Sequence, residues 1–273
     1  MVIVILELLN NTNYILLAFL ATLLTYILTS LGALSVFLFK KVNEKIMSLM
    51  FGFGAGVMIA ASFFSLILPA LNQLELSGKP FGWITIVMGF LSGGFFILLI
   101  DLLMPHLHIN SNECEGLKSK FNKKILLILS ITLHNIPEGM AIGVAFASAY
   151  LQIPGSTYIS ALMLALGIGL QNIPEGMAVS LPLRTEGMSR KKAFFYGQAS
   201  GIVEPISGIL GAVLVSVVRE ALPFVLCFAS GAMIYVVAEE LIPSGKTNEK
   251  NKLGTIGVII GFAIMMALDI ALG

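Results

Sequence analysis

Residues 131–141 read ITLHNIPEGMA, and the pattern returns at 169–178 as GLQNIPEGMA. Both copies lie within long apolar runs, and each places an imidazole or amide, a second amide and a carboxylate in that run. Polar and ionisable groups within a membrane-spanning helix are costly, so they indicate a functional site there. The repeat therefore predicts a helical membrane protein whose centre is built around Glu138 and Glu175.

The composition agrees with a membrane-embedded chain. Of its 273 residues, 57% are hydrophobic and 11% are charged, and the mean hydropathy is +0.95. Since an ordinary soluble domain has about 25% charged residues, we expect an all-α polytopic membrane protein whose first partner is the lipid bilayer. The formal net charge of +1 predicts no nucleic-acid partner.

About 20 apolar residues are needed for a helix to cross the hydrocarbon core of a bilayer. By this measure residues 1–273 are expected to form one transmembrane domain of eight helices, with a cytoplasmic loop at 104–123. The predicted spans are 14–39, 46–71, 82–103, 124–150, 156–183, 191–218, 221–242 and 253–272. Glycines four residues apart, such as Gly89 and Gly93, predict close helix–helix contacts.

The positions of lysine and arginine predict the orientation. If the N-terminus is external, every Lys and Arg except Lys79 and Arg219 falls on the internal side. Cytoplasmic links carry an excess of these residues, so both termini are expected to be external. No organelle-targeting segment is visible in the sequence, which predicts the plasma membrane.

The two motif copies fall on consecutive predicted helices that run in opposite directions. One sequence in two opposite directions is typical of an inverted repeat, whose symmetry axis lies in the membrane plane. Each motif begins roughly ten residues into its span, which is close to mid-bilayer at 1.5 Å per residue. The fourth and fifth helices are therefore expected to bring the two copies face to face.

Spacing within each copy predicts two neighbouring cation positions. Residues three or four apart share a helix face, so each glutamate has a partner on either side. The first position would use His134, Glu138, Gln171 and Glu175; the second would use Asn135, Glu138, Asn172 and Glu175, with the glutamates bridging. Imidazole, carboxylate and amide oxygen together suit Zn²⁺, Fe²⁺ or Mn²⁺ better than alkali ions.

Three prolines accompany these acids. Pro137 and Pro174 have no N–H to donate to the preceding turn, so we expect kinked helices with available carbonyl groups. Glu204 is followed by Pro205 and is a third carboxylate within a predicted span, where it could add an oxygen to the second position. The alternative is a lone acid satisfied by Ser200, Ser207 or a backbone group.

The motif could also be a structural polar contact that holds two helices together. Hydrogen bonds between spans contribute only about 0.6 to 2 kcal/mol each, and serine or asparagine would be enough to make them. Two glutamates repel each other when ionised, and a cation removes that repulsion. The chemistry therefore favours a metal site.

These residues resemble a known family. HNIPEG at 134–139 and QNIPEG at 171–176 are similar to the fourth- and fifth-helix signatures of ZIP (Zrt-, Irt-like) metal transporters. AGVM at 55–58, Pro69-Ala70, and SG at 200–201 with Glu204-Pro205 resemble the second and sixth helices of the GufA-like branch.

The resemblance implies uptake of divalent metal, chiefly Zn²⁺, into the cytosol through a two-metal centre. It also implies two three-helix repeats around the fourth and fifth helices, a homodimer, and Met58 as a further ligand of the first position. The chain departs from many members, which have His in place of Gln171, and from some, which have Asp in place of Asn172. These departures could shift affinity or metal selectivity, so Fe²⁺, Mn²⁺ and Cd²⁺ stay open as cargo.

A route from the centre to the cytosol is also implied. By this resemblance Asp101, His106 and Glu240, at the internal ends of the third and seventh spans, would line the exit path. The alternative is that they are ordinary charges at a water interface.

The sequence therefore predicts a transporter of divalent cations, with the metal as cargo and no organic cofactor. One rival is a metal-sensing receptor that binds the same ion without flux. Another is an intramembrane metalloprotease, which would need zinc ligands such as His-Glu-x-x-His. The chain contains no such motif, and His134 is its only histidine within a predicted span, so we expect that it is not an enzyme.

Overall fold

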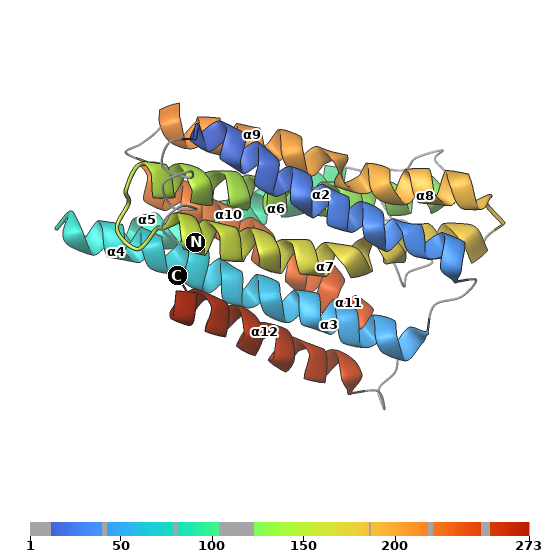
Figure 1. Cartoon of the computed structure of the whole chain (residues 1–273). Coiled ribbons are helices and arrows are strands. Elements are labelled where there is room, and N and C mark those ends of the chain that lie inside the picture. The colour runs from blue at the N-terminus through green and yellow to red at the C-terminus, as the bar shows by residue number, and fades with distance from the viewer. Residues whose placement is uncertain are drawn as a thin grey trace.

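The computed structural model describes residues 12–39, 43–78, 81–103, 123–185, 187–217, 221–246 and 252–272. All regular structure in these ranges is helical, with no strand (Figure 1). The elements are α2 (Tyr14–Leu38), α3 (Glu44–Ala61), η1 (Ser62–Ile67), α4 (Leu68–Leu76), α5 (Gly82–Leu103), α6 (Lys123–Tyr150), α7 (Tyr158–Thr185), α8 (Arg190–Ala199), η2 (Ser200–Ile202), α9 (Val203–Val217), α10 (Leu222–Val236), η4 (Val237–Leu241), α11 (Ile242–Gly245) and α12 (Leu253–Leu272).

Seven helical rods of the described chain are long and apolar enough to cross a membrane. Three of these rods are composite rods, each made of three consecutive elements. The first consists of α3, η1 and α4, the second of α8, η2 and α9, and the third of α10, η4 and α11. The chain is therefore a multi-pass membrane protein. The predicted fourth span falls on α6, which has 28 residues but whose side chains at 123–127 and 129–131 lie outside the described part. The predicted loop at 104–123 lies almost wholly outside it as well.

Two of the composite rods contain a wider, π-helical turn directly before a proline. In η1 the N–H of Leu68 donates to Phe63, five residues back, and in η4 the N–H of Ile242 donates to Val237 in the same way. Pro69 and Pro243 follow. Because a proline cannot donate and its ring crowds the preceding turn, a wider turn lets the helix continue past it.

The helices associate mainly as four pairs: α3 with α12, α2 with α7, α6 with α9, and α5 with α10. Glycine makes each pair close. On α5, Gly93 lies against the backbone of Phe228, and on α10, Gly231 lies against the backbone of Phe90. Without a Cβ atom on these glycines the two backbones can touch, as the spacing of Gly89 and Gly93 predicts.

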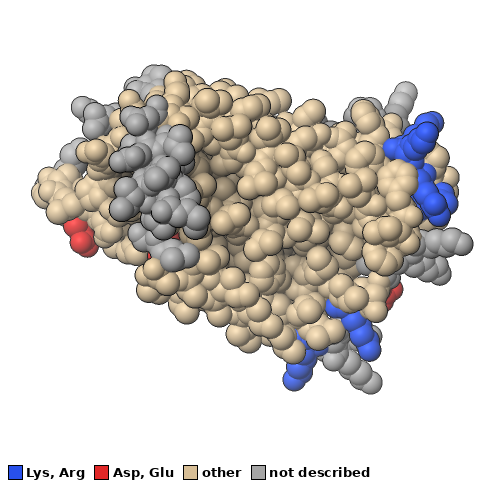
Figure 2. Space-filling model, in the orientation of Figure 1, with Lys and Arg blue, Asp and Glu red and all other residues tan. Residues whose placement is uncertain are grey.

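Exposed basic side chains lie at the ends of the rods. On the face shown in Figure 2, Lys and Arg gather at one end, and uncharged residues form a broad band between that end and the other. The exposed basic residues Lys45, Arg190, Lys191, Lys192, Lys246 and Lys252 all stand at or beside helix ends. In Figure 1 the end that carries them is where α2 ends and where α3, α8 and α12 begin.

Candidate metal centre

The two motif copies lie on α6 and α7, and their polar side chains point into the protein. All six are nearly or completely buried: His134, Asn135 and Glu138 on α6, and Gln171, Asn172 and Glu175 on α7. The two helices face each other at this level, because the amide Nε2 of Gln171 donates to Oε1 of Glu138 at 2.6 Å. The structure therefore brings together the two motif copies that the sequence pairs.

Glycine next to each glutamate allows a further helix to approach. A Cβ atom on Gly139 would collide with Ser207 and with the backbone of Glu204 on α9, and one on Gly176 would collide with the backbone of Thr29 on α2. Both motif helices are continuous through their prolines, Pro137 in α6 and Pro174 in α7. The two helices run unbroken past the site, and the kink expected at each proline stays a prediction.

Each of five motif side chains has one buried oxygen without a hydrogen-bond donor among the described residues. These atoms are Asn135 Oδ1, Glu138 Oε2, Gln171 Oε1, Asn172 Oδ1 and Glu175 Oε2. Leaving a buried acceptor unsatisfied costs about 1–3 kcal/mol. Five such atoms in a single region mark a place where a cation would replace the missing donors.

The centre also concentrates negative charge. Glu138, Glu175 and Glu204 are buried and close enough for their charges to repel one another. The charge of Glu240 also repels that of Glu175. An uncompensated charge in a low-dielectric interior is strongly unfavourable, and a divalent cation would offset it. No three His, Cys, Asp or Glu of the described ranges stand together as one metal cluster. The acids instead have amides beside them, since Gln171 donates to Glu138 and Asn172 donates to Glu204. A cation here would need the amide oxygens.

Glu204 is held by hydrogen-bond donors on two other helices. The amide Nδ2 of Asn172 donates to both of its oxygens at 2.9 Å, Thr29 Oγ1 donates to Oε1 at 3.4 Å, and Thr25 Oγ1 donates to Oε2. Ser200 and Ser207, the partners expected for a lone acid, instead donate to the backbone of their own rod.

The buried threonines of α2 lie outside both motif copies, and no motif in the sequence marks them. Thr22, Thr25 and Thr29 are three and four residues apart on an apolar helix, and all are fully buried. That spacing puts them on one helix face. A search for polar periodicity within apolar spans could have found them.

Met58 lies on α3, fully buried. One turn earlier on the same face, Gly54 packs against the Gln171 side chain. This places Met58 on the side of α3 that faces α7, without a described contact to the motif residues.

The residues predicted for the exit route lie near α10 and η4. Glu240, in η4, is 2% exposed, and Glu175 lies within range of its charge. Asp101, near the end of α5, accepts a hydrogen bond from the Tyr235 hydroxyl on α10 at 2.8 Å. His106 lies outside the described residues. The burial of Asp101 and Glu240 argues against ordinary interfacial charges.

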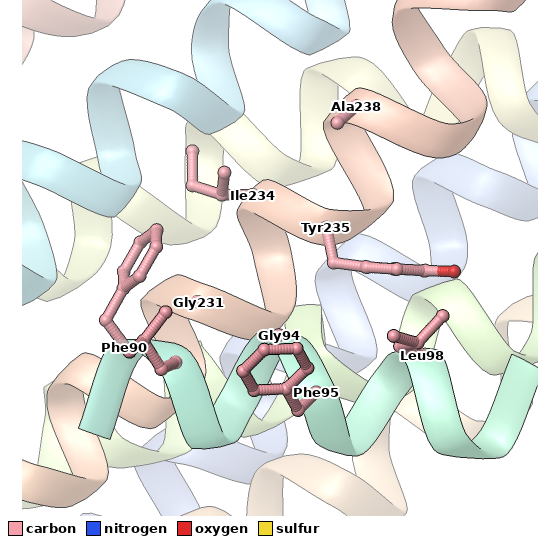
Figure 3. Close-up of a pocket in the computed structure, with 9 residues that line it drawn as sticks. Phe90, Gly94, Phe95, Leu98, Gly231, Ile234, Tyr235 and Ala238 are labelled. Carbon is pink, nitrogen blue, oxygen red and sulfur yellow. The ribbon is translucent and has the colours of Figure 1, made fainter. Parts of the chain in front are cut away.

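An apolar groove of about 240 Å³ lies between α5 and α10 (Figure 3). Phe90, Phe95, Leu98 and Ile234 line it, and Tyr235 contributes a hydroxyl. This lining offers no carboxylate, imidazole or thiol, so the groove is chemically unsuited to hold a transition metal.

Replacing Tyr235 by phenylalanine tests the link between α5 and α10. The change removes a hydrogen bond to a buried carboxylate, which is worth about 1.5–3 kcal/mol. We expect the melting temperature of the purified protein to fall by several degrees. The matched change Tyr196→Phe, at a more exposed ring on α8, should leave it unaltered. Equal melting temperatures for all three proteins would contradict a stabilising role for this bond.

Known proteins with similar sequences were found across most of the chain. A family model described as ZIP Zinc transporter matches residues 106–269. Zinc transporter ZIP11 of Xenopus tropicalis is 38% identical, over 93% of this chain and 96% of that protein. Zinc transporter GufA of Myxococcus xanthus is 37% identical, over 93% and 98%. Zinc transporter ZupT of Chlorobaculum parvum is 37% identical, over 96% and 99%.

Proposed function

The chain belongs to the ZIP family of zinc transporters, and we propose that it carries Zn²⁺ and related divalent cations through a binuclear site between α6 and α7. Members of this family are transporters and not enzymes. The observation that carries the proposal is the group of five buried oxygens, one on each of five motif residues, that accept no hydrogen bond from the described chain.

The two proposed metal positions share Glu138 and Glu175. His134 and Gln171 complete the first, with Met58 as a soft further ligand, while Asn135, Asn172 and Glu204 complete the second. The hydrogen bond from Gln171 to Glu138 supports the first grouping, and the two bonds from Asn172 to Glu204 support the second. Nitrogen, oxygen and thioether ligands in this combination fit Zn²⁺ and leave room for Fe²⁺, Mn²⁺ and Cd²⁺.

We propose eight spans, with α6 as the fourth, in an inverted repeat that relates the first three rods to the last three. The packing supports this arrangement. The pair α2–α7 in one half corresponds to the pair α9–α6 in the other. In the same way, the pair α3–α12 corresponds to the pair α10–α5. The π-helical turns η1 and η4, each before a proline, lie in the second and seventh rods. Inverted repeats of this kind place the cargo where the halves meet.

The proposed direction is import across the plasma membrane, with both termini external. The exposed Lys and Arg at one end of the rods support a cytosolic position for that end. Glu240 and Asp101, with His106, would receive the ion on its way out of the centre. A homodimer is the proposed assembly, by analogy with the family.

Uptake into liposomes tests the function. We expect the purified protein to raise the initial rate of radioactive Zn²⁺ entry at least tenfold over protein-free liposomes, with saturation as Zn²⁺ rises. Competition with Fe²⁺, Mn²⁺ and Cd²⁺ would rank the cargo. Zn²⁺ binding without entry would contradict transport and identify a metal-sensing receptor.

A further inference from the structure

Three buried threonines lie along one face of α2, and their hydroxyl groups differ in what they contact. Thr22 Oγ1 donates within its own helix, to the carbonyl of Ala18 at 2.7 Å and to that of Phe19 at 3.1 Å. Thr25 and Thr29 donate to Glu204 across the helix interface. The same type of side chain on one helix face thus has a purely local role at one position and reaches an acid at the other two.

Thr25 and Thr29 each have a second acceptor within their own helix. Thr25 Oγ1 lies 2.9 Å from the Thr22 carbonyl, and Thr29 Oγ1 lies 3.2 Å from the Thr25 carbonyl. A hydroxyl has one hydrogen, which rotates to whichever acceptor is better placed. Each hydroxyl can therefore leave Glu204 without losing its hydrogen bond.

Donors that point at Glu204 compete with a cation. The Asn172 N–H group and the two hydroxyls place their positive ends where the second metal position would have its charge. In this arrangement the oxygen of the Asn172 amide is buried and accepts nothing. The donors therefore satisfy Glu204 in the absence of metal and must turn away before it can bind one.

We propose that Thr25 is a positioning residue of the second metal position. Its hydroxyl holds Glu204 while that position is empty and releases Glu204 when an ion arrives. The inference rests on the proposed transport function. When the ion binds, the hydroxyl hydrogen turns to the Thr22 carbonyl. Removing the hydroxyl therefore destabilises the metal-free state more than the metal-bound state. Thr25 therefore keeps the second ion loosely bound, and a loosely bound ion leaves quickly.

The test is the isosteric change Thr25→Val, with two matched variants. Thr25→Ser keeps the hydroxyl, and Thr22→Val removes a hydroxyl that donates within α2. Cd²⁺ titration of the purified proteins, followed by calorimetry, gives the number of ions and the affinity for each. The hydrogen bond to the charged Glu204 is stronger than the bond to the Thr22 carbonyl that replaces it, so Thr25→Val should bind the second ion about tenfold more tightly.

Transport kinetics give a second readout. We expect Thr25→Val to lower both KM and the maximal rate of Zn²⁺ uptake, because release becomes slower, while Thr25→Ser and Thr22→Val match the wild type. A merely structural role would lower the amount of active protein and leave KM unchanged. Unchanged or weaker binding of the second ion in Thr25→Val would overturn the inference, as would failure of every variant to bind a second ion. Wild-type uptake in that case would leave the proposed transport function standing.

Discussion

Replacing Glu138 by glutamine is expected to lower the initial rate of Zn²⁺ uptake by about a hundredfold or more. Glu138 is completely buried, is shared by both proposed metal positions, and has one oxygen free of hydrogen bonds from the described residues. Loss of even an outer partner of a metal ligand typically costs about 10–100-fold in affinity or activity. Removing a charged ligand common to two ions should cost more.

The same change should not weaken the fold. Glutamine has nearly the size of glutamate, and it removes a buried charge that lies close to those of Glu175 and Glu204. In the absence of metal we therefore expect an equal or higher melting temperature, since relief of buried like charges is stabilising. Uptake and thermal stability would then change in opposite directions, which distinguishes a ligand from a structural residue.

Glu75→Gln is the matched control, because Glu75 is an exposed glutamate on α4. It should leave both uptake and melting temperature unchanged. The double change Glu138→Ala with Glu175→Ala should abolish uptake. Wild-type rates in Glu138→Gln, or in this double variant, would rule out the proposed site.

Replacing Gly143 by alanine is expected to cause a large loss of stability. A Cβ atom at this position of α6 would overlap the carbonyl of Gly208 and approach the backbone N of Ala212, both on α9. These are backbone atoms, which cannot turn aside as a side chain can. The two helices would have to separate by about 1 Å or more to restore ordinary contact.

Overpacking of this kind costs about 1–3 kcal/mol or more, which corresponds to a drop of roughly 5–10 °C in melting temperature. Gly94→Ala, on α5, is the control. Its added Cβ would meet the Gly231 carbonyl at 3.5 Å, an ordinary contact, and alanine favours a helix over glycine by about 1 kcal/mol. Thermal unfolding followed by size-exclusion chromatography compares the two. Equal stability of both variants would mean that α6 and α9 are not held in backbone contact.

Much of the architecture follows from the sequence because membrane helices leave a strong signal. Long apolar runs predict an all-helical membrane protein, and the structure and the family comparison confirm that class. The repeated motif predicts that Glu138 and Gln171 lie on facing helices, and they are in hydrogen-bond contact. Whether these residues bind metal stays a prediction.

Other features depend on which helices are neighbours, and no local pattern gives that information. Threonine is common in apolar helices, so Thr25 gains its meaning only when α9 brings Glu204 to it. Asp101 accepts a hydrogen bond from Tyr235, which lies 134 residues further along the chain. The π-helical turns could not be predicted from proline alone. Pro69 and Pro243 each follow such a turn, whereas Pro137 and Pro174 lie in ordinary α-helix.

Backbone contact at glycine has a mechanical consequence. Where Gly143 meets Gly208, or Gly176 meets Thr29, no side chains lie between the two backbones. We therefore expect each of the pairs α6–α9 and α2–α7 to move as one unit. The hydrogen bonds from Gln171 to Glu138, and from Asn172 and Thr25 to Glu204, all run from the α2–α7 pair to the α6–α9 pair. The proposed metal site therefore lies between the two helix pairs, and a displacement of one pair against the other would change the partners of these hydrogen bonds.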